Sequence, residues 1–494
     1  MAESYDVVVV GGGNAALCSA LAAQQGGAKV LVLEKAPEDE RGGNSLFTAG
    51  GFRFPHNGLE DLRKDVLTDL TDGEAAAVEV PPYTADMFAG DIDRMTESLS
   101  DETLSGLLVG RARETIVWMR EQGIRWILMF NRQSFKVGNV HRFWGGLNIE
   151  AVGGGHGLVE SLYDRCNKVG ISVAYGTGAK KLRIDQKGRV IGLTVRGPDG
   201  YRDIDAKAVI LACGGFEANP EMRCRYLGPD WELAKVRGTR HNTGDGLRMA
   251  LEIGAQPFGH FSSCHAVQWD MSAPEFGDRV VLDNFQKHSY PLGIIVNVKG
   301  ERFLDEGADF RNFTYARYGR EVLKQPKRLA FQIFDAKTIA ITRAEYRIRQ
   351  VTKAEANSLE ELADHLEIDR EGFVRTVQAY NKACQGGEFN PAVLDGVKTL
   401  GITPPKSNWA QPIDKPPYYG FGVTCGITFT FGGVRVDGQC RVLDTEDRSI
   451  PGLFAAGEMV GGIFYQNYPG GSGLMSGSVF GKLAGEGAAQ YVKH

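Results

Sequence analysis

The chain has 494 residues, more than one hydrophobic core usually serves, so two or more domains are expected. Its net charge is −5 with both signs interspersed, which argues against a nucleic-acid-binding surface. The eight cysteines include no CxxC pair and no metal-ligand spacing, so we expect a reduced, cytoplasmic protein without structural disulfides or a metal site. No uncharged apolar run reaches ~18 residues, so we expect no transmembrane helix, and we expect no signal peptide.

The first predicted unit, residues 5–35, is a strand, a tight turn, a helix and a second strand. Its first strand ends in four consecutive valines, as a parallel strand covered on both faces should. The pattern Gly11-x-Gly13-x-x-Ala16 follows, and its glycines allow a pyrophosphate to approach a helix N-terminus. Glu34 closes the second strand at the position of a ribose-binding acid, which disfavours the 2′-phosphate of NADP. The unit therefore predicts a bound dinucleotide.

A second glycine-rich loop, RGGNSLFTAGGF at 41–52, favours FAD over NAD. A nicotinamide dehydrogenase needs no such loop directly after the ribose acid, whereas the isoalloxazine of FAD lies further along and must be met by bare backbone. The chain has 64 glycines, and several later pairs, up to the run at 470–473, suggest that separate loops converge on one ligand. Each pair taken alone is also compatible with an ordinary turn.

Glycine motifs occur at both ends of the chain, so the predicted nucleotide domain is discontinuous. VILACGG at 209–215 is typical of another buried parallel strand, 359–385 has the spacing of a helical pair, and 481–492 predicts a closing helix. We therefore expect an α/β fold: a Rossmann-like FAD-binding domain formed by 1–258 and 421–494, with an inserted α+β capping domain at 259–420.

Five motifs in order resemble the flavoprotein superfamily of fumarate reductase and succinate dehydrogenase: EK…GGNSLFTAGG, VILACGGF, TGDGLRMALEIGA, GERFLDE and GLFAAGEMVGG. The resemblance runs from residue 5 to about 490. Within the superfamily, DEGADFRNFTYARYGRE and FYQNYPGGSGLMSG are most similar to the tricarballylate dehydrogenases. The resemblance implies an FAD-dependent oxidoreductase acting on CH–CH groups.

The resemblance also implies which residues hold FAD. Asp245 would lie near the adenosine half and Glu458 near the ribityl chain, although Glu458 could also be a helix N-terminal charge. Gly43-Asn44-Ser45 offers no histidine for covalent attachment, so non-covalent FAD is expected; Asn44 and Ser45 could also simply cap a helix. The expected FAD-binding residues are Gly11, Gly13, Asn14, Ala15, Glu34, Lys35, Gly43, Asn44, Ser45, Ala49, Gly50, Gly51, Gly214, Asp245, Glu458, Gly473 and Leu474.

Four residues are candidates for the chemistry. Arg311, in DEGADFRN, matches the loop arginine that transfers the proton in this superfamily, with one extra residue before it; a salt-bridged surface arginine is the alternative. Tyr468 would hydrogen-bond the substrate, and Tyr315 is a second phenol that could bind a carboxylate or move a proton, or simply be a packed aromatic. His265 stands near a substrate histidine of the superfamily, with a structural role equally open.

The chain departs from the fumarate reductases at three places. Gln286 and Ser289 replace the Glu-x-x-Arg proton relay, Phe429 replaces a substrate histidine, and Tyr468 replaces the arginine that clamps the distal carboxylate. Each change removes a charge or a proton carrier, so succinate and fumarate are poor candidates. Arg142, with His141 and Trp144 beside it, is a further candidate carboxylate clamp.

We therefore expect desaturation of a small polycarboxylate, of the type that converts tricarballylate to cis-aconitate. Electrons would pass from FAD to a separate acceptor, which could be a membrane-associated redox protein that holds this chain at the membrane periphery. The first rival is an enone- or 3-ketosteroid-type dehydrogenase or reductase, because flavin ketosteroid dehydrogenases also present Y-P-G. Three or more cationic groups facing the flavin would favour the polycarboxylate, and tyrosine-dominated walls the ketone. A rival of another class is a non-catalytic flavin-binding electron-relay subunit.

Overall fold

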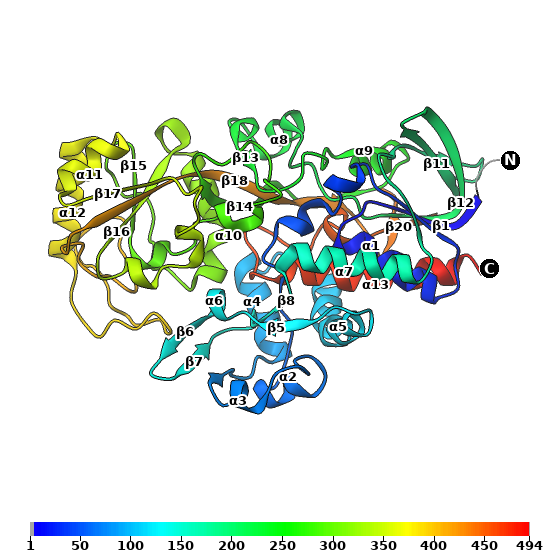
Figure 1. The fold of residues 1–494 in the computed structure, drawn as a ribbon. Coiled ribbons are helices and arrows are strands. Elements are labelled where there is room, and N and C mark those ends of the chain that lie inside the picture. The colour runs from blue at the N-terminus through cyan, green and yellow to red at the C-terminus, as the bar shows by residue number, and fades with distance from the viewer. Residues whose placement is uncertain (1–3, 494) are drawn as a thin grey trace.

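The computed structural model describes residues 4–493, apart from the side chain of Asn131. The molecule is elongated, with a large mixed sheet at one end, a second sheet at the other, and both chain termini at the end of the large sheet (Figure 1). The predicted α/β class with a Rossmann-like domain and an added cap is confirmed.

The large sheet has the strand order β10-β11-β12-β1-β2-β9, and β20 pairs with β12 and β19. Strands β9, β2, β1, β12 and β20 run parallel, and β10 and β11 continue from β12 as an antiparallel ribbon. The bounds are β1 Ser4–Val10, β2 Val30–Leu33, β9 Ser172–Ala174, β10 Gly178–Ile184, β11 Val190–Gly197, β12 Gly200–Leu211, β19 Arg441–Leu443 and β20 Ser449–Ala455.

Three helices pack side by side along this sheet: α1 Asn14–Gln25, α7 Gly154–Lys168 and α13 Ser472–Tyr491 (Figure 1). Glycines spaced by four on α13 let it approach α1 closely. A Cβ at Gly481 would lie 2.6 Å from the Ala15 carbonyl oxygen, and one at Gly485 would lie 2.3 Å from that of Ser19. The C-terminal helix is thereby held against the first helix of the chain, so the two ends of the sequence pack together.

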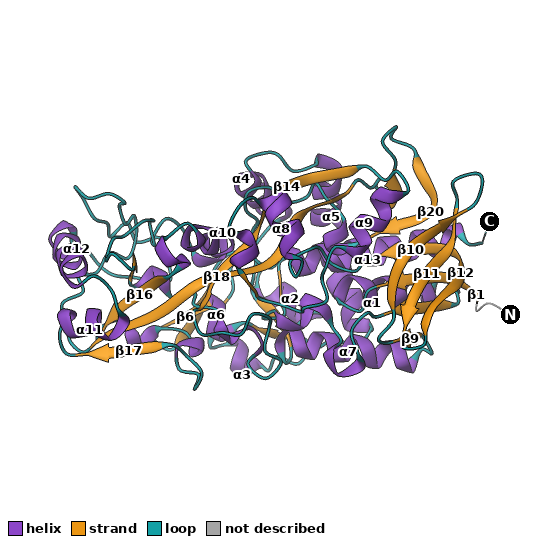
Figure 2. Cartoon of the chain, turned by 90° about the horizontal axis from the view of Figure 1, so that it is seen from above, coloured by secondary structure: helices purple, strands orange, loops and turns teal. Residues whose placement is uncertain are grey.

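The second sheet is organised around one long strand, β18, which runs through the centre of the molecule (Figure 2). Strands β13, β14, β16 and β17 all pair with β18, and β15 pairs with β16. The bounds are β13 Lys235–Val236, β14 Pro257–Asp270, β15 Ile294–Asn297, β16 Ala330–Asp335, β17 Lys353–Ala356 and β18 Tyr418–Val434.

Helices α10 Arg311–Leu323, α11 Leu359–Leu366 and α12 Arg370–Ala383 complete the capping part. The pair α11 and α12 packs on its own hydrophobic cluster, which confirms the helical pair expected at 359–385. Strand β14 extends across the predicted domain boundary at 258/259, and β18 extends across the one at 420/421. The division into domains at these positions stays a prediction. Two short helices, α8 Pro220–Leu227 and α9 Asp245–Glu252, lie in sequence between β12 and β14.

An N-terminal insertion forms the lower part of the molecule in Figure 1. Its segment 83–140 contains three helices and continues into short strands. The insertion comprises β3 Gly51–Phe52, α2 Leu59–Asp65, α3 Asp72–Ala75, β4 Val78–Glu79, α4 Ala85–Thr96, α5 Glu102–Glu121, β5 Trp126–Leu128, α6 Phe130–Gln133, β6 Ser134–Val137, β7 Val140–Phe143 and β8 Ile149–Ala151.

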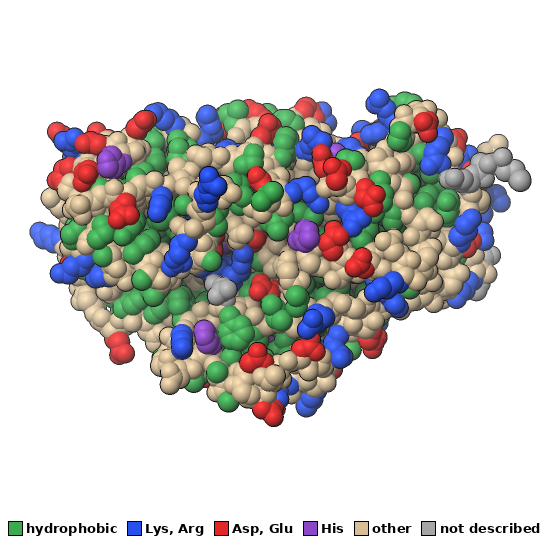
Figure 3. All heavy atoms as spheres, in the orientation of Figure 1, with side chains coloured by type: hydrophobic (Ala, Val, Ile, Leu, Met, Phe, Trp, Pro, Cys, Tyr) green, Lys and Arg blue, Asp and Glu red, His purple; other side chains and the backbone are tan. Residues whose placement is uncertain are grey.

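Acidic and basic side chains are intermixed over the face drawn in Figure 3. Within 4–493, no helix is both long and apolar enough to pass through a membrane. Among the described residues, no group of three or more His, Cys, Asp and Glu side chains is arranged to hold a metal ion, and the eight cysteines are unpaired.

Candidate active site

One cavity passes between the large sheet and the cap and collects nearly all of the predicted site residues. All four candidate catalytic residues line it: Arg311, Tyr315, His265 and Tyr468. So do the following candidate FAD-binding residues: Gly11, Gly13, Asn14, Ala15, Glu34, Lys35, Gly43, Asn44, Ser45, Ala49, Gly51, Gly214, Asp245, Glu458, Gly473 and Leu474. Gly50 instead packs against the backbone of Gly154, where a Cβ would lie 2.5 Å away.

The turn after β1 is built for close approach of a ligand to the backbone. Gly11 has φ +116°, and a Cβ there would lie 2.4 Å from the Ala212 carbonyl oxygen, so only glycine is accommodated. Gly13 precedes the first residue of α1, and the N-terminus of that helix therefore faces the cavity. This arrangement fits the pyrophosphate of a dinucleotide.

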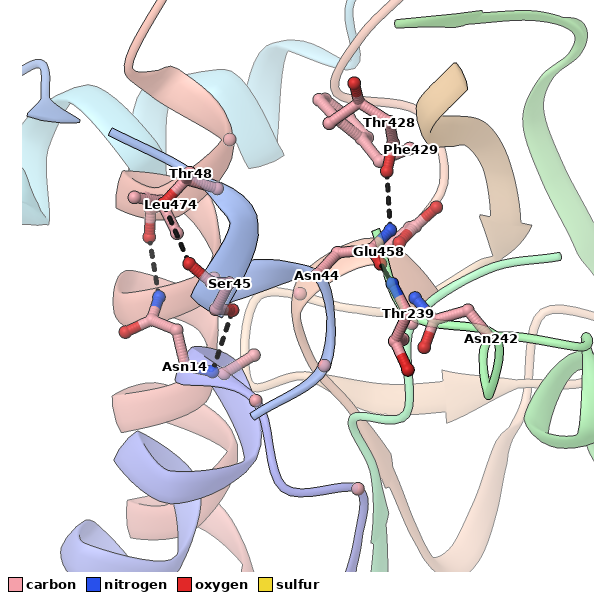
Figure 4. A pocket seen from close by; sticks show the side chains of 18 of the residues that line it. Asn14, Asn44, Ser45, Thr48, Thr239, Asn242, Thr428, Phe429, Glu458 and Leu474 are labelled. Carbon is pink, nitrogen blue, oxygen red and sulfur yellow. Dashed lines mark hydrogen bonds between the residues drawn. The ribbon is translucent and has the colours of Figure 1, made fainter. Parts of the chain in front are cut away.

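Polar side chains from distant segments fix the walls of this end of the cavity (Figure 4). The Asn14 N–H donates to Ser45 Oγ over 3.0 Å, and Asn14 Nδ2 donates to the Leu474 carbonyl over 3.0 Å. Asn44 Nδ2 donates to the Thr428 carbonyl over 2.6 Å, and its Oδ1 accepts from the Thr239 N–H over 2.9 Å. Asn44 thus connects segments across the cavity, and Ser45 accepts the first N–H of α1 from a distant loop.

Glu34 and Asp245 lie in the adjoining part of the cavity, at the carboxyl end of β2. Glu34 is buried and accepts the Ala36 N–H over 2.8 Å, and burial raises its pKa to about 7. Asp245 forms an ion pair with Lys35 over 2.8 Å. A buried carboxyl group beside the dinucleotide turn is suited to accept hydrogen bonds from ribose hydroxyl groups.

Glu34→Gln is expected to remove a pH dependence of FAD binding. Ribose hydroxyl groups favour the ionised carboxylate, so the pKa of Glu34 falls on binding and the affinity of the wild type rises as pH increases toward 7 and above. Between pH 5.5 and 8 the wild-type affinity should increase roughly tenfold, and that of the variant much less. Fluorescence titration of the apoprotein measures both; an equal increase in the two proteins would contradict the role of Glu34.

A pair of glutamates, Glu458 on the cavity wall and the buried Glu217, lies further along the cavity. Glu458 Oε1 accepts from the N–H and the hydroxyl of Thr430, over 2.6 and 2.8 Å. Burial raises the pKa of Glu458, and burial together with Glu458 raises the pKa of the fully buried Glu217 well above its usual range. Both shifts favour the protonated forms of these carboxyl groups. Glu217 follows VILACGGF directly, does not line the cavity and was not predicted.

The far end of the cavity is an aromatic corner around His265. The Tyr315 and Tyr468 hydroxyls are 2.5 Å apart, and the Tyr468 hydroxyl lies 3.2 Å from His265 Nδ1. The Phe429 ring packs edge-on against His265 and Tyr468. Burial lowers the pKa of His265 well below 6.5 and raises that of Tyr468 well above 10, so a neutral imidazole and a protonated phenol face each other.

Arg311, the first residue of α10, enters this corner from the cap. Its Nη2 donates to the Arg132 carbonyl over 3.0 Å, its buried Nε has no acceptor, and no described carboxylate forms an ion pair with it. Its guanidinium lies 5.4 Å from the centre of the Tyr315 ring. Burial, assisted by Arg132, lowers the pKa of Arg311 below its ordinary value. Arg311 is thus neither a surface nor a salt-bridged arginine.

Two further arginines, Arg132 and Arg237, line the same end of the cavity and were not predicted. Arg132 comes from the N-terminal insertion and pairs with Asp283 over 2.7 Å; Asp283 raises the pKa of Arg132 although burial opposes it. The insertion therefore does bring an arginine to the cavity, but not the expected one. Arg142 is exposed and pairs with Glu79 over 3.0 Å.

Gln286 and Ser289, the residues expected in place of a proton relay, have structural partners. Gln286 lines the cavity and donates through Nε2 to Asp283 over 2.8 Å. The Ser289 N–H donates to the Tyr346 hydroxyl over 2.8 Å, and the Ser289 hydroxyl accepts from the Arg343 N–H over 3.0 Å. Gln286 thereby orients Asp283, which in turn holds Arg132.

The glycine run before α13 allows tight packing behind the aromatic corner. Gly471 has φ +88°, and a Cβ there would lie 2.4 Å from the Leu147 side chain. A Cβ at Gly470 would lie 3.0 Å from the Tyr315 ring. The helix can therefore begin at Ser472, with Gly473 and Leu474 of its first turn on the cavity wall.

Comparison with known proteins agrees with this geometry. The family model described as FAD binding domain matches residues 6–474. A fumarate reductase (cytochrome) of Shewanella frigidimarina is 29% identical over 99% of this chain and 78% of its own length. A 3-oxosteroid 1-dehydrogenase of Mycolicibacterium smegmatis is 26% identical, covering 98% of this chain and 96% of that protein. The open conformation of a flavocytochrome c3 fumarate reductase superposes with a TM-score of 0.73 at 27% identity, covering 100% of this chain and 79% of that one.

The family model covers nearly the whole chain, and these relatives are oxidoreductases. The expected fold relationship to the fumarate reductase and succinate dehydrogenase flavoproteins is confirmed, and a flavin-binding subunit without turnover is disfavoured. The chain belongs to the FAD binding domain family and is an FAD-dependent oxidoreductase that acts on CH–CH groups.

Proposed function

We propose that this enzyme desaturates a C–C bond of a small polycarboxylate, with oxidation of tricarballylate to cis-aconitate as the type reaction. The observation that carries the proposal is the charge at the substrate end of the cavity. Arg132, Arg237 and Arg311 line it, and among the described residues only Arg132 of these three has a carboxylate partner. Buried guanidinium groups without a counter-ion are costly, and a ligand with several carboxylates would supply the missing charge.

The reaction removes a hydride, with its electron pair, from one carbon and a proton from the neighbouring carbon. The electron pair that the proton leaves behind forms the new double bond. FAD supplies the hydride-accepting nitrogen when it is bound. Arg311 is the group that we propose receives the proton; a charged guanidinium cannot accept one, so Arg311 would act in this step as the transiently neutral guanidine, which its lowered pKa favours. Tyr468 would donate a hydrogen bond to a substrate oxygen, since its phenol stays protonated. The two electrons then leave to a separate acceptor, either a soluble or a membrane-associated redox protein.

A ketone substrate is the second candidate, favoured by the paired hydroxyls of Tyr315 and Tyr468 beside Phe429. This wall would suit a carbonyl oxygen, and a 3-oxosteroid 1-dehydrogenase is among the relatives. A neutral ketone, however, leaves Arg237 and Arg311 without counter-ions. The charge of the cavity therefore supports the polycarboxylate first.

Anaerobic mixing of the oxidised holoprotein with candidate substrates tests the proposal. Tricarballylate is expected to bleach the flavin absorbance, succinate much less, and a 3-ketosteroid not at all. The oxidised product from each bleached sample is then identified by mass spectrometry, which controls for trace reductants. Bleaching by the ketosteroid alone would assign the enzyme to ketones and contradict the proposal.

A further inference from the structure

Arg237 is a buried arginine that no motif of the chain singles out. It follows β13 directly, and its N–H donates to the Ile427 carbonyl over 2.8 Å, so its backbone is fixed to the central strand β18. The residue is only 4% exposed and lines the cavity. Its guanidinium lies 5.9 Å from the centre of the Trp269 ring, and its Nη1 contacts Thr428, the neighbour of Phe429 in the aromatic corner.

The described residues satisfy the Arg237 guanidinium only in part: Asp283 favours its charged form from a distance but is ion-paired with Arg132. Its one hydrogen bond from the guanidinium runs from Nη1 to Thr428 Oγ1 over 3.4 Å, and its buried Nε has no acceptor. Among the described carboxylates, none forms an ion pair with it, whereas the equally enclosed Arg302 is paired with Glu306. An arginine held rigidly in a cavity wall with a free Nε presents unused donors for a planar anion.

We propose that Arg237 binds a second substrate carboxylate, separate from the one at Arg311. This inference rests on the proposed function and deepens it, because it names the residue that binds the second carboxylate of the substrate. Tyr468 occupies the position at which the superfamily's arginine holds the distal carboxylate. Arg237, which follows β13, supplies a positive charge at the same corner of the cavity. Tyr468 then donates a single hydrogen bond.

Binding of cis-aconitate to the oxidised holoprotein tests the inference without turnover. Its three deletion analogues, glutaconate, citraconate and itaconate, each lack a different carboxylate. Arg237→Gln should weaken cis-aconitate binding roughly 100-fold, as expected for loss of a buried charge pair. Exactly one analogue, the one without the carboxylate held by Arg237, should bind the wild type and the variant with nearly equal affinity. Perturbation of the flavin absorbance and equilibrium dialysis give the dissociation constants.

Two further variants make the result interpretable. Arg237→Lys keeps a positive charge and should retain part of the affinity, so a loss caused by misfolding is distinguished from loss of charge. Arg240→Gln, in the same segment but exposed and paired with Glu40, should bind all four acids as the wild type does. Flavin content and thermal unfolding of every variant are measured in parallel.

The possible outcomes separate this inference from the proposed function. Unchanged cis-aconitate binding by Arg237→Gln overturns the inference and leaves the polycarboxylate function standing. An equal loss for all four acids also overturns it, because Arg237 would then act on the cavity or on the flavin as a whole. Failure of the wild type to bind any of the acids overturns the proposed function itself.

Discussion

Arg311→Gln is expected to reduce turnover by a factor of roughly 10³ or more, because it removes both the proton-transfer group and a carboxylate anchor. Glutamine can still hydrogen-bond a substrate oxygen but can neither carry the charge nor take up a proton. FAD content should remain that of the wild type, because Arg311 lies at the substrate end of the cavity. Steady-state kinetics with an artificial electron acceptor, and flavin absorbance of the purified variant, measure the two effects.

A matched control lies on the same helix. Arg317 is an exposed arginine of α10, so Arg317→Gln should leave turnover close to the wild-type value. Arg311→Lys keeps a cation that can release a proton and should be more active than Arg311→Gln. If Arg311→Gln turned over at the wild-type rate, Arg311 would not be the proton-transfer group, and that role would fall to the phenols of Tyr315 and Tyr468.

Gly13→Val is expected to abolish FAD binding while the protein remains folded. At Gly13 a Cβ would meet only Ser45 Oγ at 3.3 Å and the Gly42 carbonyl oxygen at 3.7 Å, and φ is −89°. The backbone therefore accepts a side chain, with a small loss of stability. The added methyl groups would instead occupy the space in front of the first turn of α1, where the pyrophosphate must approach.

Flavin absorbance of the purified protein measures FAD binding, and circular dichroism during thermal unfolding measures the stability of the fold. Gly106→Ala serves as the control, because a Cβ at this helical glycine would have no neighbouring atom within 4 Å. That variant should retain FAD and gain slightly in stability. Gly13→Val with full FAD content would show that the pyrophosphate lies elsewhere.

The nucleotide-binding part could be predicted in detail because its signals are local. The apolar strand, the Gly11-x-Gly13 turn and Glu34 follow one another within about 30 residues, so spacing alone places them. The α13 helix begins at Ser472, before the predicted start at 481, because a glycine-rich stretch hides a helix whose glycines pack against α1. Composition alone underestimates helices of this kind.

The substrate end could be predicted only in part, because its charges converge from distant segments. Arg311 and Tyr468 lie in recognisable motifs, whereas Arg132 lies in the four-residue helix α6 of an insertion and Arg237 follows the two-residue strand β13. Their positions in the cavity depend on the pairing of β13 with β18 and on the contact of Arg132 with Asp283. Such long-range contacts leave no periodic signal in the sequence, and Arg142, which resembled a clamp, is turned to Glu79 at the surface.

A crystal structure of the holoprotein with cis-aconitate tests most directly whether the arginines of the cavity are there to bind carboxylates. The distances to be measured are those from the ligand's carboxylate oxygens to the guanidinium nitrogens of Arg237 and Arg311. We predict two different carboxylates within hydrogen-bonding distance, one at each arginine, with the reacting carbons over the flavin. Carboxylates that lie away from both arginines, or arginines that have turned to carboxylates of the protein, would contradict the proposed binding mode.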